Sequence, residues 1–186
     1  IEMFEAASEC LQEAFQHKIL RHICNTAGIE RYPDAQFDMV RLGIGLYGID
    51  PFTNQIIHNV STLKTTILQI HEVPKEETVG YSRKGHLERD SRIAAIPIGY
   101  ADGLNRRLGN GHAYCLVNGQ RAAYVGNICM DVCMIDVTDI DCKEGDQVII
   151  FGEELPVTVL SDTIDTIPYE VLTGISNRVK RVYYQD

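Results

Sequence analysis

The stretch Ile93–Arg106 reads IAAIPIGYADGLNR, and the interpretation of the whole chain starts from it. Its apolar first part, Ile93–Ile98, predicts a buried strand. The strand pattern stops at two glycines that bracket Tyr100 and Asp102, which predicts a sharp turn with a tyrosine at the end of the strand. A phenol in that position is either an amphipathic packing residue or a group that donates and accepts protons. The stretch alone leaves both interpretations open.

The composition is that of an ordinary globular protein, with 45% hydrophobic and 23% charged residues among 186. A formal net charge of −9 and the lack of any Lys/Arg cluster argue against nucleic acid or an anionic membrane surface as partner. No apolar run approaches the roughly 20 residues needed to cross a bilayer. Because the chain begins with Ile1 inside a helical pattern, we expect it to be a piece of a longer polypeptide.

The six cysteines contain no CxxC pair that would indicate a metal site. Cys129 and Cys133 are each followed by a methionine in an apolar strand pattern, and no histidine lies close to them in sequence. We therefore expect no metal, and reduced thiols of the kind found in the cytoplasm.

The first part of the chain has the pattern of a repeating α/β architecture. Residues 1–18 place apolar and acidic residues at helical spacing, and residues 19–24 form a short apolar stretch. A polar turn and a second short helical segment lead to an apolar strand that begins at Met39 and runs into closely spaced glycines. The order of helix, strand, turn, helix and strand predicts a parallel α/β fold, with too few repeats to close a sheet or barrel.

The pattern changes at Pro51, beyond which short strands and turns dominate. Residues 53–186 therefore predict a mainly antiparallel β domain with little helix. The expected strands are 63–72, 92–98, 113–117, 121–125, 133–137, 147–151 and 178–184, and the expected helices are 157–166 and 169–175. Asn118 followed by Gly119 is the signal of a type I′ hairpin turn, and residues 144–146 predict a second turn.

Four further stretches are candidate functional motifs in addition to GYADG, residues 99–103. They are HICNT (22–26), RLGIGLYG (41–48), VGNICMD (125–131) and GISNRV (174–179). In this order they resemble the alanine racemases, pyridoxal-phosphate enzymes with a TIM-type parallel β/α barrel followed by a β domain. The resemblance implies that residues 1–52 are the last units of a truncated cofactor-binding barrel. It also implies that residues 53–186 are the C-terminal β domain, antiparallel and barrel-like.

The resemblance implies interconversion of L- and D-alanine in the cytoplasm, supplying D-alanine for peptidoglycan. Racemisation removes a proton from one face of Cα and delivers one to the other, which suits two bases on opposite faces. In the family one base is the Schiff-base lysine of the cofactor, which lies upstream of the part matched here, so we expect this chain alone to be inactive. The other base is the tyrosine matched by Tyr100. A phenol acting as a base needs cationic or hydrogen-bonded neighbours.

The same resemblance assigns the cofactor contacts to the barrel fragment. Arg41 matches an arginine facing the pyridine nitrogen, where it leaves that nitrogen neutral. His22 matches the histidine that orients this arginine. Thr26 stands where the family commonly has serine and keeps the hydroxyl for the phosphate, and the N–H groups of Gly43 and Ile44 complete the phosphate site.

Met130 matches a residue whose backbone N–H contacts the substrate carboxylate, and Asp131 is expected to orient that loop. The family also implies a homodimer in which the tyrosine enters the active site of the partner subunit. Two positions depart from the family pattern: Asn127 stands where many members have arginine, and Asn177 where some have tyrosine. Both departures concern substrate breadth more than the type of reaction.

Two alternatives to an alanine racemase stay open on the sequence. One is a racemase of broader specificity that acts on serine or longer side chains. The other is a non-catalytic β module that mediates dimerisation or binds a partner. A preceding barrel sequence with the cofactor lysine would favour an enzyme, and one without it would favour the module.

Overall fold

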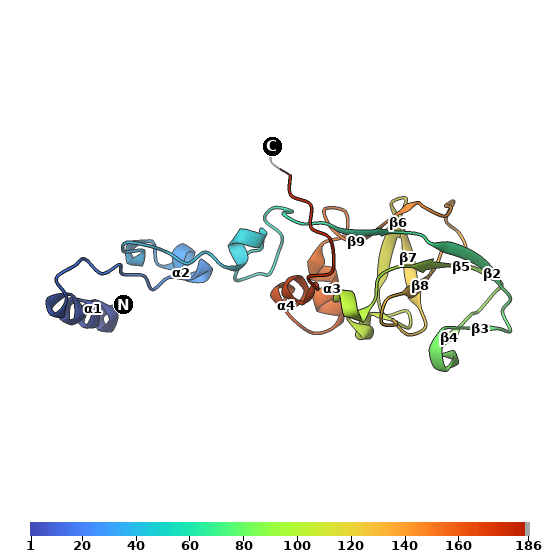
Figure 1. The fold of residues 1–186 in the computed structure, drawn as a ribbon, viewed down its shortest axis with the longest axis horizontal. Coiled ribbons are helices and arrows are strands. Elements are labelled where there is room, and N and C mark those ends of the chain that lie inside the picture. Colours follow the sequence, from blue (N-terminus) through green and yellow to red (C-terminus); the bar gives the residue numbers. More distant parts are fainter. Residues whose placement is uncertain (185–186) are drawn as a thin grey trace. The chain divides into compact units, whose positions relative to one another are not determined.

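The computed structural model describes residues 1–184 and divides the chain into two units, residues 1–60 and the residues from Ser61 onward (Figure 1). The smaller unit contains helices joined by extended segments, and the larger one contains all the strands of the described residues. Within residues 1–184 no helix is both long enough and apolar enough to cross a membrane.

The smaller unit begins with helix α1, Glu2–Ala14, and continues with the short helix α2, Thr26–Arg31. Two 3-10 turns follow, η1 at Pro33–Ala35 and η2 at Ile44–Tyr47. The helix expected over residues 1–18 ends earlier because Phe15 adopts an extended conformation, at φ −119° and ψ 137°. The side-chain oxygen of Asn25 caps α2 by accepting the N–H of Gly28 at 3.0 Å.

The two strands expected in this unit, over residues 19–24 and from Met39, do not form. All of residues 1–60 are described, and they contain no β-strand. The two segments still run side by side, since the N–H of Arg41 donates to the carbonyl of Cys24 at 2.9 Å. A parallel strand satisfies its backbone polar groups only between neighbouring strands, and this unit supplies too few of them. The expectation of two strands in this unit was therefore wrong.

The larger unit is built around a seven-stranded antiparallel sheet with the order β1-β9-β6-β7-β8-β5-β2. Its strands are β1 (Leu63–Thr66), β2 (Gln69–Val73), β5 (Ser91–Ile96), β6 (Tyr114–Val117), β7 (Gln120–Val125), β8 (Cys133–Asp136) and β9 (Gln147–Phe151). A separate hairpin pairs β3 (Thr78–Val79) with β4 (Gly85–His86), and the 3-10 turn η3 (Tyr81–Arg83) connects them. The prediction of an antiparallel β domain is confirmed.

The single strand expected over residues 63–72 is two strands that lie at opposite edges of the sheet. The pairing changes partner in the middle of this stretch. The N–H of Ile67 donates to the carbonyl of Asp146, just before β9, and the N–H of Leu68 donates to the carbonyl of Ala95 on β5, both at 2.9 Å. One continuous stretch thus borders both edges, so the sheet curls round on itself as a barrel.

The barrel core is made of inward-facing side chains from alternate strand positions. In β8, Cys133 and Ile135 are buried while Met134 and Asp136 are only partly covered, which is the period of two expected of a barrel strand. The hairpin between β6 and β7 forms as predicted, because Asn118 and Gly119 have φ angles of 48° and 74°, both positive as a type I′ turn requires.

Two short helices, α3 (Val157–Thr163) and α4 (Pro168–Gly174), lie at one end of the barrel (Figure 1). Both were expected, although α3 is shorter than residues 157–166. The 3-10 turns η4 (Tyr100–Asp102) and η5 (Arg106–Leu108) complete the elements of this unit.

The closing strand expected over residues 178–184 is absent from the structure, which describes all of these residues. None of its residues pairs with either edge strand of the sheet, β1 or β2. The segment is instead fixed by the guanidinium of Arg181, which donates to the carbonyls of Ser176 at 2.7 Å and Val179 at 2.9 Å.

Ile135 tests the barrel core because its side chain is 0% exposed. We expect Ile135→Ala to lower the free energy of unfolding of the larger unit by about 2–5 kcal/mol, since the lost methyl and methylene groups leave a cavity. The control is Leu68→Ala, where the side chain is 55% exposed and the expected change is within about 0.5 kcal/mol. Urea unfolding followed by near-ultraviolet circular dichroism measures both, and equal effects would contradict the barrel core.

Candidate active site

Tyr100 lies where the sequence predicts, in the turn η4 that follows β5. The turn is closed by its own residues: the Asp102 carboxylate accepts the N–H of Gly99 at 2.8 Å, and the N–H of Asp102 donates to the carbonyl of Gly99 at 3.0 Å. Gly103 ends the turn at φ 106°, a left-handed conformation that favours glycine. The Tyr100 side chain is 43% exposed, so its hydroxyl is accessible to another molecule.

The loop that carries Met130 packs directly against this turn. The N–H of Tyr100 donates to the carbonyl of Cys129, and the N–H of Ala101 donates to the carbonyl of Met130, both at 3.0 Å. A Cβ atom on Gly99 would lie 2.4 Å from each of those two carbonyl oxygens. The glycine is therefore required because two backbones meet at this point. The expected catalytic and substrate-binding residues of the larger unit are thus brought together.

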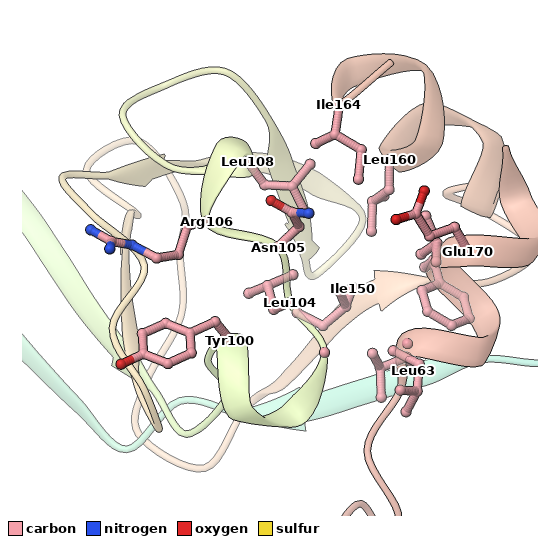
Figure 2. A pocket seen from close by; sticks show the side chains of 15 residues that line it. Leu63, Tyr100, Leu104, Asn105, Arg106, Leu108, Ile150, Leu160, Ile164 and Glu170 are labelled. Atoms are coloured by element: carbon pink, nitrogen blue, oxygen red, sulfur yellow. The ribbon is translucent and has the colours of Figure 1, made fainter. Parts of the chain in front are cut away.

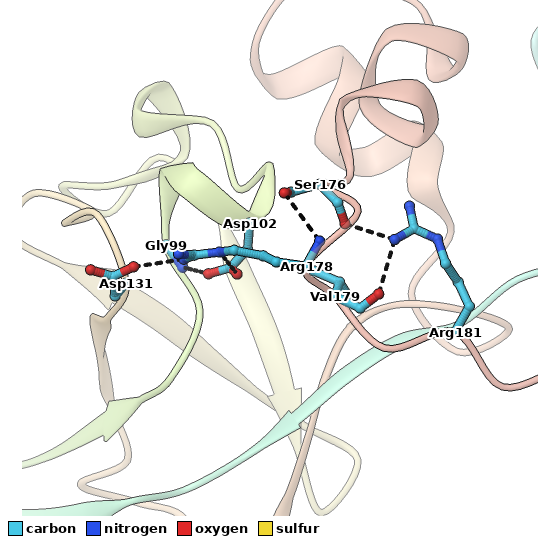
Figure 3. A network of polar contacts seen from close by, with 7 residues as sticks. All are labelled: Gly99, Asp102, Asp131, Ser176, Arg178, Val179 and Arg181. Atoms are coloured by element: carbon cyan, nitrogen blue, oxygen red, sulfur yellow. Dashed lines mark hydrogen bonds and ion pairs between the residues drawn. The ribbon is translucent and has the colours of Figure 1, made fainter.

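A third motif reaches the same place from the C-terminal segment. The Arg178 guanidinium donates from Nε to Asp102 Oδ1 and from Nη2 to Asp131 Oδ1, each at 2.7 Å (Figure 3). The Asp102 side chain keeps only 13% of its accessibility and the Asp131 side chain 62%. Sequence reasoning placed Arg178 in a motif without giving it a role. The sequence did offer one signal for this contact, because one motif contains an arginine and two others each contain an aspartate that could pair with it.

These contacts set the protonation of the groups involved. Burial raises the pKa of the Asp102 carboxyl, but the hydrogen bonds from Arg178 and from the N–H of Gly99 outweigh burial, so the pKa lies below its ordinary value of 3.8. Hydrogen bonds to Asp102 and then Asp131 raise the pKa of the Arg178 guanidinium. At neutral pH these contacts therefore keep the Asp102 carboxylate and the Arg178 guanidinium charged.

Arg106 lies beside the tyrosine, with its guanidinium carbon 5.9 Å from the centroid of the Tyr100 ring. Both residues border a cavity of about 390 Å³ between the turns and the two C-terminal helices (Figure 2). Most of its lining is apolar, from residues such as Leu104, Leu160 and Ile164. In Figure 2 the Tyr100 and Arg106 side chains project away from these apolar residues. The phenol thus lies at the border of the cavity, with one cationic side chain beside its ring.

In the smaller unit the expected phosphate residues come together. The Thr26 hydroxyl oxygen accepts the N–H of Gly43 at 2.8 Å and the N–H of Gly45 at 3.4 Å. A Cβ atom on Gly45 would lie 2.8 Å from Cγ2 of Thr26, so glycine permits the approach. Ile44 lies between the two glycines and is buried. The N–H of Gly43, expected to bind phosphate directly, is thus engaged by Thr26, whose hydroxyl proton stays available for an anion.

Arg41 and His22, the pair expected to face the cofactor ring, both lie in the smaller unit. The Arg41 guanidinium is exposed and donates to the carbonyl of Ile23 at 3.1 Å. The Nδ1 atom of His22 is buried and has no hydrogen-bond partner among residues 1–184. His22 therefore does not orient Arg41 through that nitrogen in this structure.

The cysteines show the features of structural thiols. All six are free, and Cys115 and Cys133 are buried in the barrel. Burial raises the pKa of the Cys115 thiol to about 12 and raises that of Cys133 as well, so both stay protonated and unreactive. Among the described residues, no group of three or more His, Cys, Asp or Glu side chains could hold a metal ion.

Two models of known protein families match the chain, and together they cover the motifs described above. The model of the alanine racemase C-terminal domain matches residues 60–183, and that of the alanine racemase N-terminal domain matches residues 1–51. The chain belongs to the alanine racemase family. It is 44% identical to the alanine racemase of Clostridium novyi (strain NT) over 178 residues, which is 89% of this chain and 46% of that protein.

Solved alanine racemases share the fold. The alanine racemase of Clostridium difficile 630 is similar with a TM-score of 0.86 and 38% identity, covering 97% of this chain and 48% of that one. The alanine racemase of Bartonella henselae with covalently bound pyridoxal phosphate gives 0.80 and 35% identity, covering 96% of this chain and 50% of that one. The chain thus spans about half the length of the relatives it matches.

Gly99 provides a direct test of the contact between turn and loop. We expect Gly99→Ala to destabilise the larger unit by about 1–3 kcal/mol, because its Cβ would push the loop carbonyls away from the turn. The control is Gly174→Ala at the end of α4, where an added Cβ meets nothing within 4 Å. Thermal unfolding of the two variants measures the difference, and a Gly99→Ala protein as stable as the control would contradict the contact.

The depressed pKa of Asp102 predicts that the stability of the fold depends on pH in the acid range. Because its folded pKa is depressed, its contribution to stability is complete above the ordinary value of 3.8 and is lost as the pH falls from there towards the folded pKa. We expect Asp102→Asn to remove this component of the acid-induced loss of stability. Carbon NMR of the Asp102 carboxyl measures the pKa directly, and titration at or above 3.8 would show that the expected sign is wrong.

Proposed function

We propose that the chain is the C-terminal part of an alanine racemase that interconverts L- and D-alanine with pyridoxal phosphate. The observation that carries this proposal is the pair of backbone bonds between the Tyr100 turn and the Met130 loop. They bring an exposed phenol close to the loop that matches the substrate-binding loop of the family. A β module without catalysis has no need of an accessible tyrosine held in this way.

In this proposal Tyr100 is the base on one face of the substrate Cα, and it takes up or delivers the proton at its hydroxyl oxygen. Arg106 supplies positive charge beside the ring. The backbone N–H of Met130 binds the substrate carboxylate. Pyridoxal phosphate, when bound, supplies the electron sink that makes the Cα proton removable. The second base lies in the part of the relatives that this chain does not cover.

The residues of the smaller unit fit the cofactor in their donor chemistry. Thr26 accepts two backbone N–H groups and so has its hydroxyl proton free for a phosphate oxygen. Gly43 positions this hydroxyl, and the N–H of Ile44 is assigned to the same phosphate. The exposed Arg41 guanidinium only donates, which suits a neutral ring nitrogen. The buried and unpartnered Nδ1 of His22 can bond a further polar group.

The remaining expectations belong to the same proposal. Residues 1–52 would be the end of the cofactor-binding barrel, and residues 53–186 the β domain. The complete enzyme would be a cytoplasmic homodimer with shared active sites, and it would supply D-alanine for peptidoglycan. The 186-residue chain alone would be inactive.

A racemase of broader specificity is the second candidate, and one observation favours it. Asn127 stands where many family members carry arginine, and its short side chain is held between its neighbours. Its Oδ1 accepts from Asn110 at 3.1 Å, and its Nδ2 donates to the carbonyl of Tyr81 at 3.4 Å. A short neutral group in this loop leaves more room than an arginine, so substrates larger than alanine belong in any assay.

The test joins this chain to the N-terminal half of the Clostridium novyi alanine racemase and measures racemisation of alanine and of larger amino acids. We expect activity that depends on pyridoxal phosphate, and none from the 186-residue chain alone. Tyr100→Phe should lower kcat by about 10²–10⁴-fold, the usual contribution of a general base.

The matched control is Tyr114→Phe, since Tyr114 also has an arginine over its ring, with the Arg121 guanidinium carbon 4.5 Å from the centroid. This variant should keep full activity. An active fusion whose Tyr100→Phe variant loses nothing would exclude Tyr100 as a base. A folded fusion that racemises no amino acid would favour the binding module.

A further inference from the structure

We propose that Arg178 is a positioning residue that fixes the Tyr100 turn against the Met130 loop by bridging Asp102 and Asp131. It touches no reacting atom and acts through the two segments that do. Its catalytic consequence rests on the proposed function, whereas the attachment itself is a property of the 186-residue chain.

The geometry of the bridge suits an arginine. Two different nitrogens of one planar group, Nε and Nη2, donate to two different carboxylates, each at 2.7 Å. A guanidinium presents its donors in fixed directions, so it sets the angle between its partners as well as their distance. A lysine has one ammonium on a flexible stem and can neutralise both carboxylates without fixing that angle.

At one end the bridge reaches the start of the tyrosine turn. The carboxylate of Asp102 uses both oxygens: Oδ1 accepts from Arg178, and Oδ2 accepts the N–H of Gly99 at 2.8 Å. The N–H of Ser176 also donates to the backbone carbonyl of Asp102 at 3.0 Å. The C-terminal segment is therefore attached to the turn through side chain and backbone together.

At the other end the bridge reaches Asp131, which directly follows Met130. The carbonyls of Cys129 and Met130 are already held by the first residues of the turn. Arg178 adds an attachment on the far side of Met130, so that residue is held from both sides. The backbone hydrogen bonds alone would let the turn and the loop rotate relative to each other about the line of those bonds. The second attachment, through Arg178, prevents this rotation.

The exposure of the partners indicates what loss of the bridge would do. The Asp131 side chain is 62% exposed, and exposed ion pairs add little to global stability. Removing the arginine should therefore leave the barrel folded and loosen the turn and loop locally. Proton transfer is sensitive to such loosening, because a misplacement of about 1 Å can reduce the rate about 10²-fold.

The first experiment measures amide hydrogen exchange by NMR in the chain as it stands. In Arg178→Gln we expect the N–H groups of Tyr100 and Ala101 to exchange about tenfold faster or more, while barrel amides such as that of Tyr124 keep their wild-type rates. Arg178→Lys should fall between Arg178→Gln and the wild type.

The matched control is Arg89→Gln, which removes another arginine–aspartate pair, that with Asp139, from the same unit. It should leave the amides of the tyrosine turn unchanged. If Arg178→Gln does not fold, Asp131→Ala removes only the acceptor on the loop and should still accelerate the N–H of Ala101. Wild-type exchange at the turn, or equal acceleration of every amide in the unit, would overturn the proposal.

The second experiment measures racemisation in the fusion with the N-terminal half of a related racemase. Arg178→Gln should lower kcat by about 10–100-fold, with partial recovery in Arg178→Lys and no change in Arg89→Gln. Full activity in Arg178→Gln would overturn the catalytic consequence. If the wild-type fusion does not racemise any amino acid, the proposed function fails, and hydrogen exchange still decides the attachment.

Discussion

The larger unit depends on the close contact between two backbones at Gly99. The turn that begins there donates two N–H groups to the carbonyls of Cys129 and Met130, and a side chain at Gly99 would prevent this contact. The contact needs a glycine at one position and a sharp turn after a buried strand, and the stretch GYADG supplies both. An exposed phenol and the loop proposed to bind substrate follow from it. The positions of the phenol and of this loop are therefore a consequence of backbone packing at one end of a barrel.

The barrel fixes both partners of this contact. β5 ends at the tyrosine turn, β8 begins just after the Met130 loop, and the two strands pair from Ile93 with Asp136 to Ile96 with Cys133. Closure of the sheet through Ile67 and Leu68 then places β5 between β8 and β2, so neither end of the contact lies on a free edge. Arg178 joins the same site from a segment that lies outside the sheet. Two neighbouring strands and one cluster of charged side chains thus hold together the tyrosine turn, the Met130 loop and the segment of Arg178, which are far apart in the sequence.

Local signals in the sequence predicted most strands and turns of the larger unit, but not the hairpin of β3 and β4, and they predicted strands in the smaller unit that do not form. Asn118-Gly119 and the apolar pattern at Cys133 predict a hairpin and a strand because turn chemistry and strand patterns are properties of a few residues. The division of residues 63–72 was not predictable, because nothing local marks where a strand changes partner. The strand expected over residues 178–184 did not form, because a strand needs a pairing partner and the local sequence does not show whether the fold supplies one. The resemblance grouped Thr26 with the Gly43 loop, whereas the engagement of the Gly43 N–H and the contacts of Arg178 depend on geometry that only the structure supplies.

The central claim is that this chain contributes one of two bases on opposite faces of the substrate Cα. The most direct measurement is deuterium incorporation at Cα of each alanine enantiomer, in deuterated water, by the Tyr100→Phe variant of the fusion. The account predicts that the variant exchanges the Cα hydrogen of one enantiomer and hardly that of the other, because the remaining base serves one face only. Exchange of both enantiomers at the wild-type rate would contradict it.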